Sequence, residues 1–478
     1  MTEITEPSLK RLSWRERRVQ EWVAELPAAE PERALAQLAH SVQALNTSAI
    51  EPIDRIALLR HYEGPVMNLV AAARRRSEST ASLAITVYSE LAQGYAMALT
   101  PDLRPAMRQR ACIGALQSLG ELVRCAYRGY APVPPGLWRR IHRIFQEGGS
   151  NPSPLLEDAY KAVLLMGLGD PYALPSGGVD RVAAVIEHFG HMAELSTFHG
   201  FAIHPTQDTP AAPLRETEEA GLYLDTTRLL QEINRLRAGL RERRTLPAEF
   251  AGTMLPTVAD QIFSLLADAW VPGIRRRSLR VRLSGERLVC LGFAALRDVV
   301  ANPDEVPVHY IDLDSPLTAD IEPALSGSLP NVTTWQIQDA GETGLWLTTR
   351  GPGLTPPRPG MLIGIKEPGP EGAWQAAVVR WLKRSRPQEY AIGVQVLGAA
   401  TNAMVLEGIT PLPGVRIEPR HKAPPMLLVP PGRLSAGRRV RLQTGGQEVT
   451  DLVLARLEQT GGLDRFALAT KGPARVNH

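Results

Sequence analysis

The sequence predicts an α+β multidomain protein: an all-helical N-terminal half, then a small antiparallel β-barrel with a β-rich C-terminal extension. Two changes of pattern support this prediction. Apolar residues recur every three or four positions over roughly the first 270 residues, and they alternate with polar residues after Pro272. The length of 478 residues is enough for several domains. We expect a helical domain at 1–268, the barrel at 269–400 and the extension at 401–478.

Helical periodicity in the first half appears as stripes of apolar residues on single helix faces. One stripe consists of Leu116, Leu119, Val123 and Ala126. Another follows Asp225, a residue type that caps helices, and consists of Leu229, Ile233, Leu236 and Leu240. A stripe as short as this second one is typical of core packing, and the alternative is the seam of a homo-oligomer.

Strand-like alternation in the second half occurs in short runs that are separated by glycine and proline. Residues 335–337 and 345–347 flank a turn-like segment, and longer alternating runs cover 374–382 and 392–396. Gly351–Gly360 is one of the separating segments. Short strands with this punctuation predict a small antiparallel barrel.

The composition excludes several classes of protein. The net charge of +3 is too small for a polycation that coats nucleic acid, and no apolar run of 18 residues predicts a membrane span. The segment Met1–Arg18 lacks the apolar stretch of a secretory signal. Cys112, Cys125 and Cys290 have neither metal-binding spacing nor an even number, which favours a reduced, cytoplasmic protein.

Common enzyme signatures are missing, so we predict no catalytic residue and no enzyme activity. The sequence has no GxxxxGK[ST] phosphate loop, GxSxG elbow, HExxH motif or CxxC pair. His188 and His191 could share one helix face, but zinc needs three or four fixed ligands, and we predict no metal site. Glu157 and Asp158 are an acidic pair of the kind that begins a helix.

Charge is unevenly distributed around the expected junction of the two halves. Between residues 228 and 287 the basic residues are all arginine. Between 298 and 349 there are nine acidic residues and no lysine or arginine. We interpret the part near 302–330 as a flexible acidic insertion. It is either a solvated linker or a segment that covers the arginines when no ligand is bound and so competes with the ligand.

Two short motifs have the chemistry to bind a nucleotide. Arg276, Arg277 and Arg280 lead into a strand, and arginine offers a planar fork of donors that suits phosphate and can stack on a purine. Asp339 begins the turn-like segment that ends at Gly344. A carboxylate accepts hydrogen bonds from the amino groups of a purine edge, and glycine permits a close backbone approach.

These motifs resemble those of the PilZ domain family, which binds cyclic di-GMP through an RxxxR segment and a later [D/N]xSxxG motif. Arg276 and Arg280 match the first motif, and Asp339 and Gly344 match the ends of the second. Gly341 stands where the second motif has serine. The segments 377–381 (AVVRW) and 393–396 (GVQV) are also similar to that family. The resemblance covers about 270–400 and implies a PilZ-like antiparallel β-barrel.

The resemblance implies a cyclic di-GMP receptor or effector in signalling to motility, pili or surface polysaccharide. Arg276, Arg277 and Arg280 would contact phosphate and guanine, Asp339 would contact a guanine edge, and the glycines, Gly341 and Gly344, would shape the turn. The helical domain would contact an unidentified protein partner. Two alternatives remain open: a PilZ-like scaffold that binds no ligand, and a protein that binds nucleic acid without sequence preference through its arginines.

Overall fold

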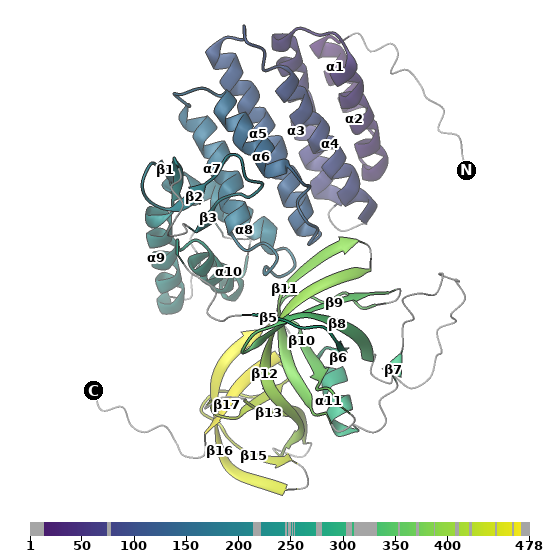
Figure 1. Cartoon of the computed structure of the whole chain (residues 1–478), viewed down its shortest axis with the longest axis vertical. Coiled ribbons are helices and arrows are strands. Elements are labelled where there is room, and N and C mark those ends of the chain that lie inside the picture. The colour runs from purple at the N-terminus through teal and green to yellow at the C-terminus, as the bar shows by residue number, and fades with distance from the viewer. Residues whose placement is uncertain are drawn as a thin grey trace. The chain divides into compact units, whose positions relative to one another are not determined.

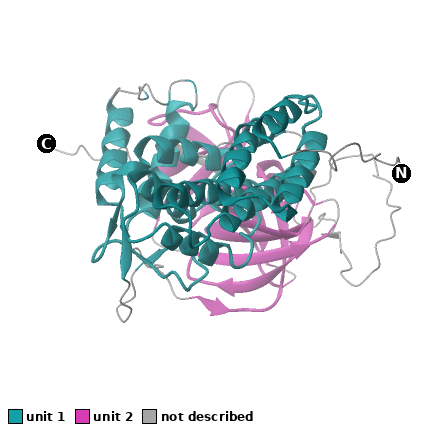
Figure 2. Cartoon of the chain, turned by 90° about the horizontal axis from the view of Figure 1, so that it is seen from above, with its two compact units in different colours: residues 1–275 teal, residues 276–478 magenta. Residues whose placement is uncertain are grey.

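The computed structural model describes 14–73, 78–213, 221–243, 246, 250, 252, 254–273, 280–302, 308–309, 332–351, 354–369, 372–386, 388–406, 411–419, 423–444, 447–460 and 463–469. The chain divides into two compact units, 1–275 and 276–478 (Figure 2). Unit 1 is mostly helical and unit 2 is mostly antiparallel strand, which confirms the α+β multidomain prediction (Figure 1). The acidic insertion expected near 302–330 lies outside the described residues apart from residues 302 and 308–309 at its start.

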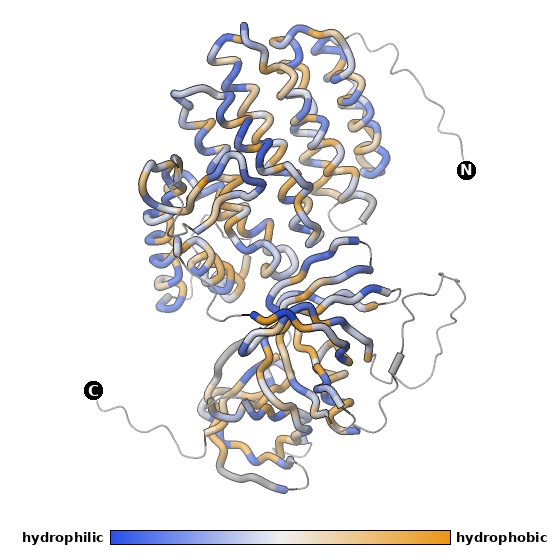
Figure 3. Tube along the Cα trace, in the orientation of Figure 1, coloured by the Kyte–Doolittle hydropathy of each residue, from blue (hydrophilic) through white to orange (hydrophobic). Residues whose placement is uncertain are grey.

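The helices of unit 1 show alternating polar and apolar turns along the tube in Figure 3. Proline occupies the first position of α2, α3, α5, α7 and α10, where the missing N–H has no helical partner to lose. The helices are α1 (Glu16–Ala24), α2 (Pro31–Thr47), α3 (Pro52–Ala73), α4 (Glu78–Met97), α5 (Pro105–Arg128), α6 (Leu137–Glu147), α7 (Pro154–Leu168), α8 (Gly178–Phe189), the short 3-10 turn η2 (Gly190–Met192), α9 (Thr227–Arg243) and α10 (Pro256–Ala269).

The predicted apolar stripes of unit 1 lie in one hydrophobic core. The four residues of the α5 stripe are each no more than 1% exposed. Those of the α9 stripe are no more than 6% exposed and pack in the same core, so within the described chain this stripe is core packing. The carboxylate of Asp225 accepts the amide of Thr227 over 2.8 Å, a local contact two residues along the chain. The capping position itself is Thr226, whose carbonyl accepts the first helical hydrogen bond of α9, from Leu230, so Asp225 lies one residue before the expected capping position.

Unit 1 also contains a small antiparallel sheet, so the half predicted to be all-helical is not exclusively helical. Its strands are β1 (Glu194–Ser196), β2 (Phe201–Ile203), β3 (Ala212–Pro213) and β4 (Leu222–Asp225), in the order β1-β4-β2-β3. They have two to four residues each. Strands this short do not carry enough alternation to be recognised from the sequence.

Unit 2 is one continuous sheet that closes on itself twice. The strands β11, β10, β6, β8, β9 and β12 form one ring because β11 also pairs with β12. The strands β12, β13, β14, β17, β16 and β15 form a second ring because β12 also pairs with β15. The predicted barrel and its β-rich extension therefore share β12, which spans 17 residues.

The strands of unit 2 are β5 (Val281–Arg282), β6 (Glu286–Leu291), β7 (Val308–His309), β8 (Val332–Ala340), β9 (Gly344–Arg350), β10 (Leu362–Lys366), β11 (Trp374–Arg386), β12 (Glu389–Val405), β13 (Leu412–Glu418), β14 (Met426–Val429), β15 (Arg439–Thr444), β16 (Gln447–Thr460) and β17 (Leu463–Ala469). The helix α11 (Phe293–Ala301) packs its buried Leu296 and Val299 on Cys290 of β6 and on apolar residues of β10 and β11. Ile337, Leu347 and Ile392, which are neighbours across β8, β9 and β12, are at most 4% exposed.

Cys112, Cys125 and Cys290 are buried free thiols. Burial raises the pKa of the Cys112 thiol and of the Cys290 thiol to about 12, so both are protonated at neutral pH. In the part of the chain that the structure describes, no helix combines the length and apolarity that crossing a bilayer requires.

Candidate ligand-binding site on the barrel

The turn between β8 and β9 carries the second predicted motif. Asp339 is the penultimate residue of β8, and the amide of Gly341 donates a hydrogen bond to the carbonyl of Gly344 over 2.8 Å. The carbonyl of Thr343 accepts the amide of Val396 on β12, also over 2.8 Å. Main-chain hydrogen bonds therefore hold the turn on both sides, and its conformation does not depend on a side chain at position 341.

The short strand β5 brings the end of the first motif beside this turn. It pairs antiparallel with the end of β8, with Arg282 opposite Asp339. Arg280 directly precedes β5, and its Nη1 lies 2.9 Å from Oδ1 of Asp339. The pairing of β5 with β8 thus places two predicted site residues, 59 positions apart in the sequence, in direct contact.

The side chains of this ion pair are only partly exposed, 29% for Arg280 and 15% for Asp339. A pair that water still reaches contributes on the order of 1 kcal/mol or less to stability. Its main effect is to orient both groups at the end of the hairpin. The side chain of Arg282 is exposed and forms no hydrogen bond or ion pair with another described residue. The hairpin end therefore combines forked cationic donors, which suit phosphate, with one oriented carboxylate.

The predicted site residues differ in what the structure describes of them. Arg280 and Asp339 come together, and Gly341 and Gly344 form the turn beside them. Arg276 and Arg277 lie outside the described residues. The sequence motifs do not show that Arg280 and Asp339 are in contact, whereas the structure does.

A pair of tryptophans on the outer face of the same strands was not among the predicted site residues. Trp346 on β9 lies opposite Gly393 on β12, and Trp381 on β11 lies opposite Gly393 on its other side. The indole of Trp381 covers Gly393 so closely that a Cβ there would overlap it. The two ring centroids are 6.2 Å apart, and the buried Nε1–H of Trp346 has no acceptor among the described residues.

The sequence did contain a signal for the outward position of Trp346. Leu347 belongs to the buried face of β9, and neighbouring residues of a strand point to opposite faces. Trp346 therefore had to face outward. Only the register shows that a glycine and a second tryptophan lie beside it.

The other groups considered from the sequence have structural contacts. Asp158 pairs with Lys161 over 2.8 Å. The ring of His188 packs edge-on against Phe250. Within the described ranges, no three or more histidine, cysteine, aspartate or glutamate residues are grouped so that they could hold a metal ion.

Comparison with known proteins gives two matches. The family model "Cyclic-di-GMP receptor FimW, N-terminal domain" matches residues 17–200. The whole chain is similar to the cyclic-di-GMP receptor FimW of Pseudomonas aeruginosa, with 24% identity over 560 aligned positions that cover 95% of this chain and 90% of that protein.

The two matches cover different parts of the fold. The FimW family model stays inside unit 1, from α1 to the glycine before β2. The longer alignment with FimW covers 95% of the chain and therefore extends across both units. The similarity to FimW therefore does not depend on the helical unit alone.

Proposed function

We propose that this chain is a cyclic di-GMP receptor that acts through inter-domain or partner contacts in signalling to motility, pili or surface polysaccharide, and that it is not an enzyme. A reduced, cytoplasmic setting is part of this proposal, because the three cysteines are buried and free of disulfides. The similarity to FimW, a protein named as a cyclic-di-GMP receptor, supports the ligand. The PilZ-like motifs on unit 2 support the location of its site.

The observation that carries the proposal is the contact of Arg280 with Asp339 at the end of the β8–β9 hairpin. Cyclic di-GMP offers two phosphates and two guanines. The guanidinium of Arg280 suits the phosphate, and the carboxylate of Asp339 suits the N–H donors on the Watson–Crick edge of guanine. Because the two side chains touch, one nucleotide unit can reach both of them.

Because position 341 is glycine, the site lacks a hydroxyl contact to the ligand. The amide of Gly341 is already bonded to the carbonyl of Gly344. In this proposal the turn supplies shape, while the arginines and Asp339 supply the polar contacts. Arg276 and Arg277 are the proposed further contacts to phosphate and guanine. Arg282 is exposed on the same edge.

Isothermal titration of the full chain with cyclic di-GMP, with GTP as the control ligand, tests the proposal. We expect Arg280→Ala to weaken binding about tenfold or more, because a charged hydrogen bond to phosphate is lost. Arg297→Ala is the matched control, since Arg297 forms a similar pair with Asp298 on α11, with 2.6 Å between Nη2 and Oδ1. No heat from the wild-type chain, or an equal loss in both variants, would contradict the proposal.

A further inference from the structure

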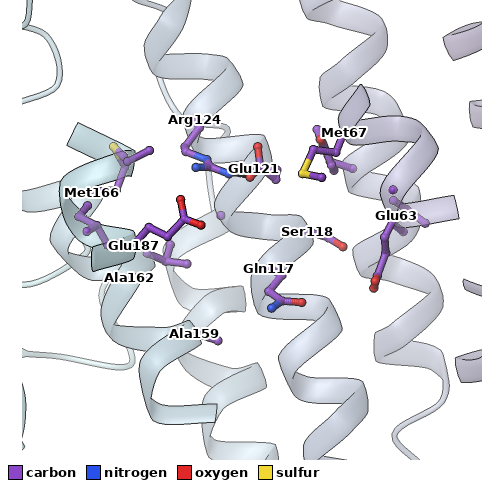
Figure 4. A pocket seen from close by; sticks show the side chains of 17 residues that line it. Glu63, Met67, Gln117, Ser118, Glu121, Arg124, Ala159, Ala162, Met166 and Glu187 are labelled. Atoms are coloured by element: carbon purple, nitrogen blue, oxygen red, sulfur yellow. Dashed lines mark ion pairs between the residues drawn. The ribbon is translucent and has the colours of Figure 1, made fainter. Parts of the chain in front are cut away.

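Unit 1 contains a pocket of about 590 Å³ that none of the predicted site residues lines. Figure 4 shows Glu63 and Met67 of α3 on one side, and Met166 of α7 and Glu187 of α8 on the other. Between them, α5 contributes a row of polar residues that includes Glu121 and Arg124 in the same view. The pocket is thus an open hollow lined by several helices of one compact unit.

Small residues keep this pocket open. Gly64, Ala159, Ala162 and Ala183 line it, and each leaves space that a larger side chain would fill. A Cβ built on Gly64 would meet no heavy atom within 4 Å, so the space beside α3 is real. Beside the pocket, α3 touches α5 only lightly, whereas α4 packs closely against both.

Hydrogen bonds and an ion pair hold the polar residues of the pocket in place. The hydroxyl of Tyr95 donates to Oε1 of Glu63 over 2.5 Å, and Arg124 pairs with Glu121. Burial raises the pKa of the Glu63 carboxyl, against the opposing effect of the Tyr95 hydrogen bond and of Arg60 and Arg110. The walls are therefore pre-formed, which lowers the entropy cost of binding.

The rim offers one unpaired charge and adaptable apolar surface. The side chain of Glu187 on α8 is exposed and forms no hydrogen bond or ion pair with another described residue. Met67 is 55% exposed, so its apolar side chain is available to a partner. Methionine side chains adapt to irregular apolar partners, and they are common at surfaces that bind peptide helices.

We propose that this pocket binds a short, amphipathic, basic segment of a partner protein. Apolar side chains of the segment would contact Met67, Met166 and the alanines, and a lysine or arginine would pair with Glu187. Charge complementarity favours a basic segment, because the Glu187 side chain has no cationic partner in the part of the chain that the structure describes, and Arg124 is already paired with Glu121. The proposal goes beyond nucleotide binding and does not depend on it, because it rests on residues of unit 1 alone.

The test uses a fluorescein-labelled, 14-residue peptide of leucine, alanine and lysine with one apolar face. Two control peptides carry the same composition without the apolar face, or glutamate in place of lysine. Fluorescence anisotropy with the full chain, without nucleotide, should show binding of the first peptide alone. Failure of this assay would leave the cyclic di-GMP titration unaffected, so the two proposals can fail separately.

Two pairs of variants test whether the peptide binds at the pocket. We expect Glu187→Arg to weaken binding of the basic peptide about tenfold, because repulsion replaces an ion pair. Glu242→Arg makes the same change on α9, outside the pocket, and should leave affinity within about twofold. Likewise Met67→Lys should weaken binding, whereas Met97→Lys, at a 44% exposed methionine of α4 that does not line the pocket, should not.

Four outcomes would overturn the proposal. They are no binding of the first peptide, equal effects within each pair of variants, binding of the acidic peptide, and a concentration-dependent dimer by analytical ultracentrifugation that Glu187→Arg or Met67→Lys abolishes. The last result would identify a second copy of this chain as the occupant. Circular dichroism of each variant distinguishes lost binding from lost folding.

Discussion

The proposed barrel site and the proposed helical pocket would select their ligands in opposite ways. The barrel site presents partly exposed charged side chains at the end of a hairpin, and the strand register brings Arg280 to Asp339. The helical pocket is a hollow of about 590 Å³ between pre-formed walls, and its shape comes from small residues such as Gly64 and Ala162.

This difference predicts which substitutions each site tolerates. At the barrel, affinity should depend on single charged groups, and stability should depend little on them. At the pocket, binding should depend on the packing of helices that lie far from the ligand. The following experiments test this contrast, in order of decreasing expected effect.

Trp270→Ala should have the largest effect, and it should be confined to the pocket. Trp270 is fully buried after α10, and its Nε1 donates to the carbonyl of Leu165 on α7 over 3.1 Å. Loss of such a side chain costs about 3–5 kcal/mol of unfolding free energy. Relative to the wild-type chain, amide hydrogen exchange in the variant should become faster in α7 and stay unchanged in the barrel strands. Peptide binding should be lost, while the affinity for cyclic di-GMP should stay within about twofold. Equal effects on both ligands would remove the contrast.

Gly393→Ala should damage the barrel site through packing. The added Cβ would overlap the indole of Trp381, and such overpacking costs about 1–3 kcal/mol. Chemical denaturation of the variant measures this loss. The double variant Gly393→Ala with Trp381→Ala removes the obstacle, so it should be more stable than the sum of the two single changes predicts. Additive effects would show that the indole does not restrict position 393.

Asp339→Asn should separate binding from stability. We expect cyclic di-GMP affinity to fall about tenfold, because a charged acceptor becomes a neutral one. The unfolding free energy should change by less than about 1 kcal/mol, because the pair with Arg280 is partly exposed. Asp298→Asn on α11 is the control for both measurements. A large loss of stability with unchanged affinity would make Asp339 a structural residue only.

His142 should make unit 1 sensitive to mild acid. Its ring nitrogens contact the hydroxyl of Tyr160 at 2.7 Å and the carbonyl of Thr209 at 2.8 Å. Burial lowers the pKa of His142, against the opposing effects of Thr209 and Asp208. The unfolded chain therefore takes up a proton at higher pH, near 6.5, than the folded chain does.

It follows that the unfolding free energy should fall as the pH decreases below about 6.5, by at most about 1.4 kcal/mol per pH unit. Urea unfolding at pH 7.5 and about pH 5.5, followed by exchange of amides in α6 and α7, measures this effect. His142→Gln should reduce the pH dependence. A pH dependence that the variant retains would assign it to another group.

Much of the fold could be predicted from the sequence because periodicity is local. The apolar stripe on α5 identified its buried face, and the alternation after Pro272 identified antiparallel strands. Cysteine spacing excluded a disulfide framework, and all three cysteines are free. These features depend on neighbouring residues and the period of the backbone, which a single sequence displays directly.

The remaining features depend on pairing between distant segments. The four-stranded sheet of unit 1 was missed because its strands are too short, and the second closed ring was missed because it depends on the pairing of β12 with β15. The candidate site was only partly predicted: the motifs named Arg280 and Asp339, but not the tryptophans around Gly393. Register determines such neighbours, and one sequence does not reveal it.

The shared strand β12 restricts how this protein can change length during evolution. Its residues up to Ala399 pair with β9 and β11, and those from Ala399 onward pair with β13 and β15. A one-residue insertion or deletion inside β12 would turn every later side chain to the opposite face, so one ring would lose its interior. Descendants of this sequence should therefore gain or lose residues in the connections around β12, while β12 itself keeps its length.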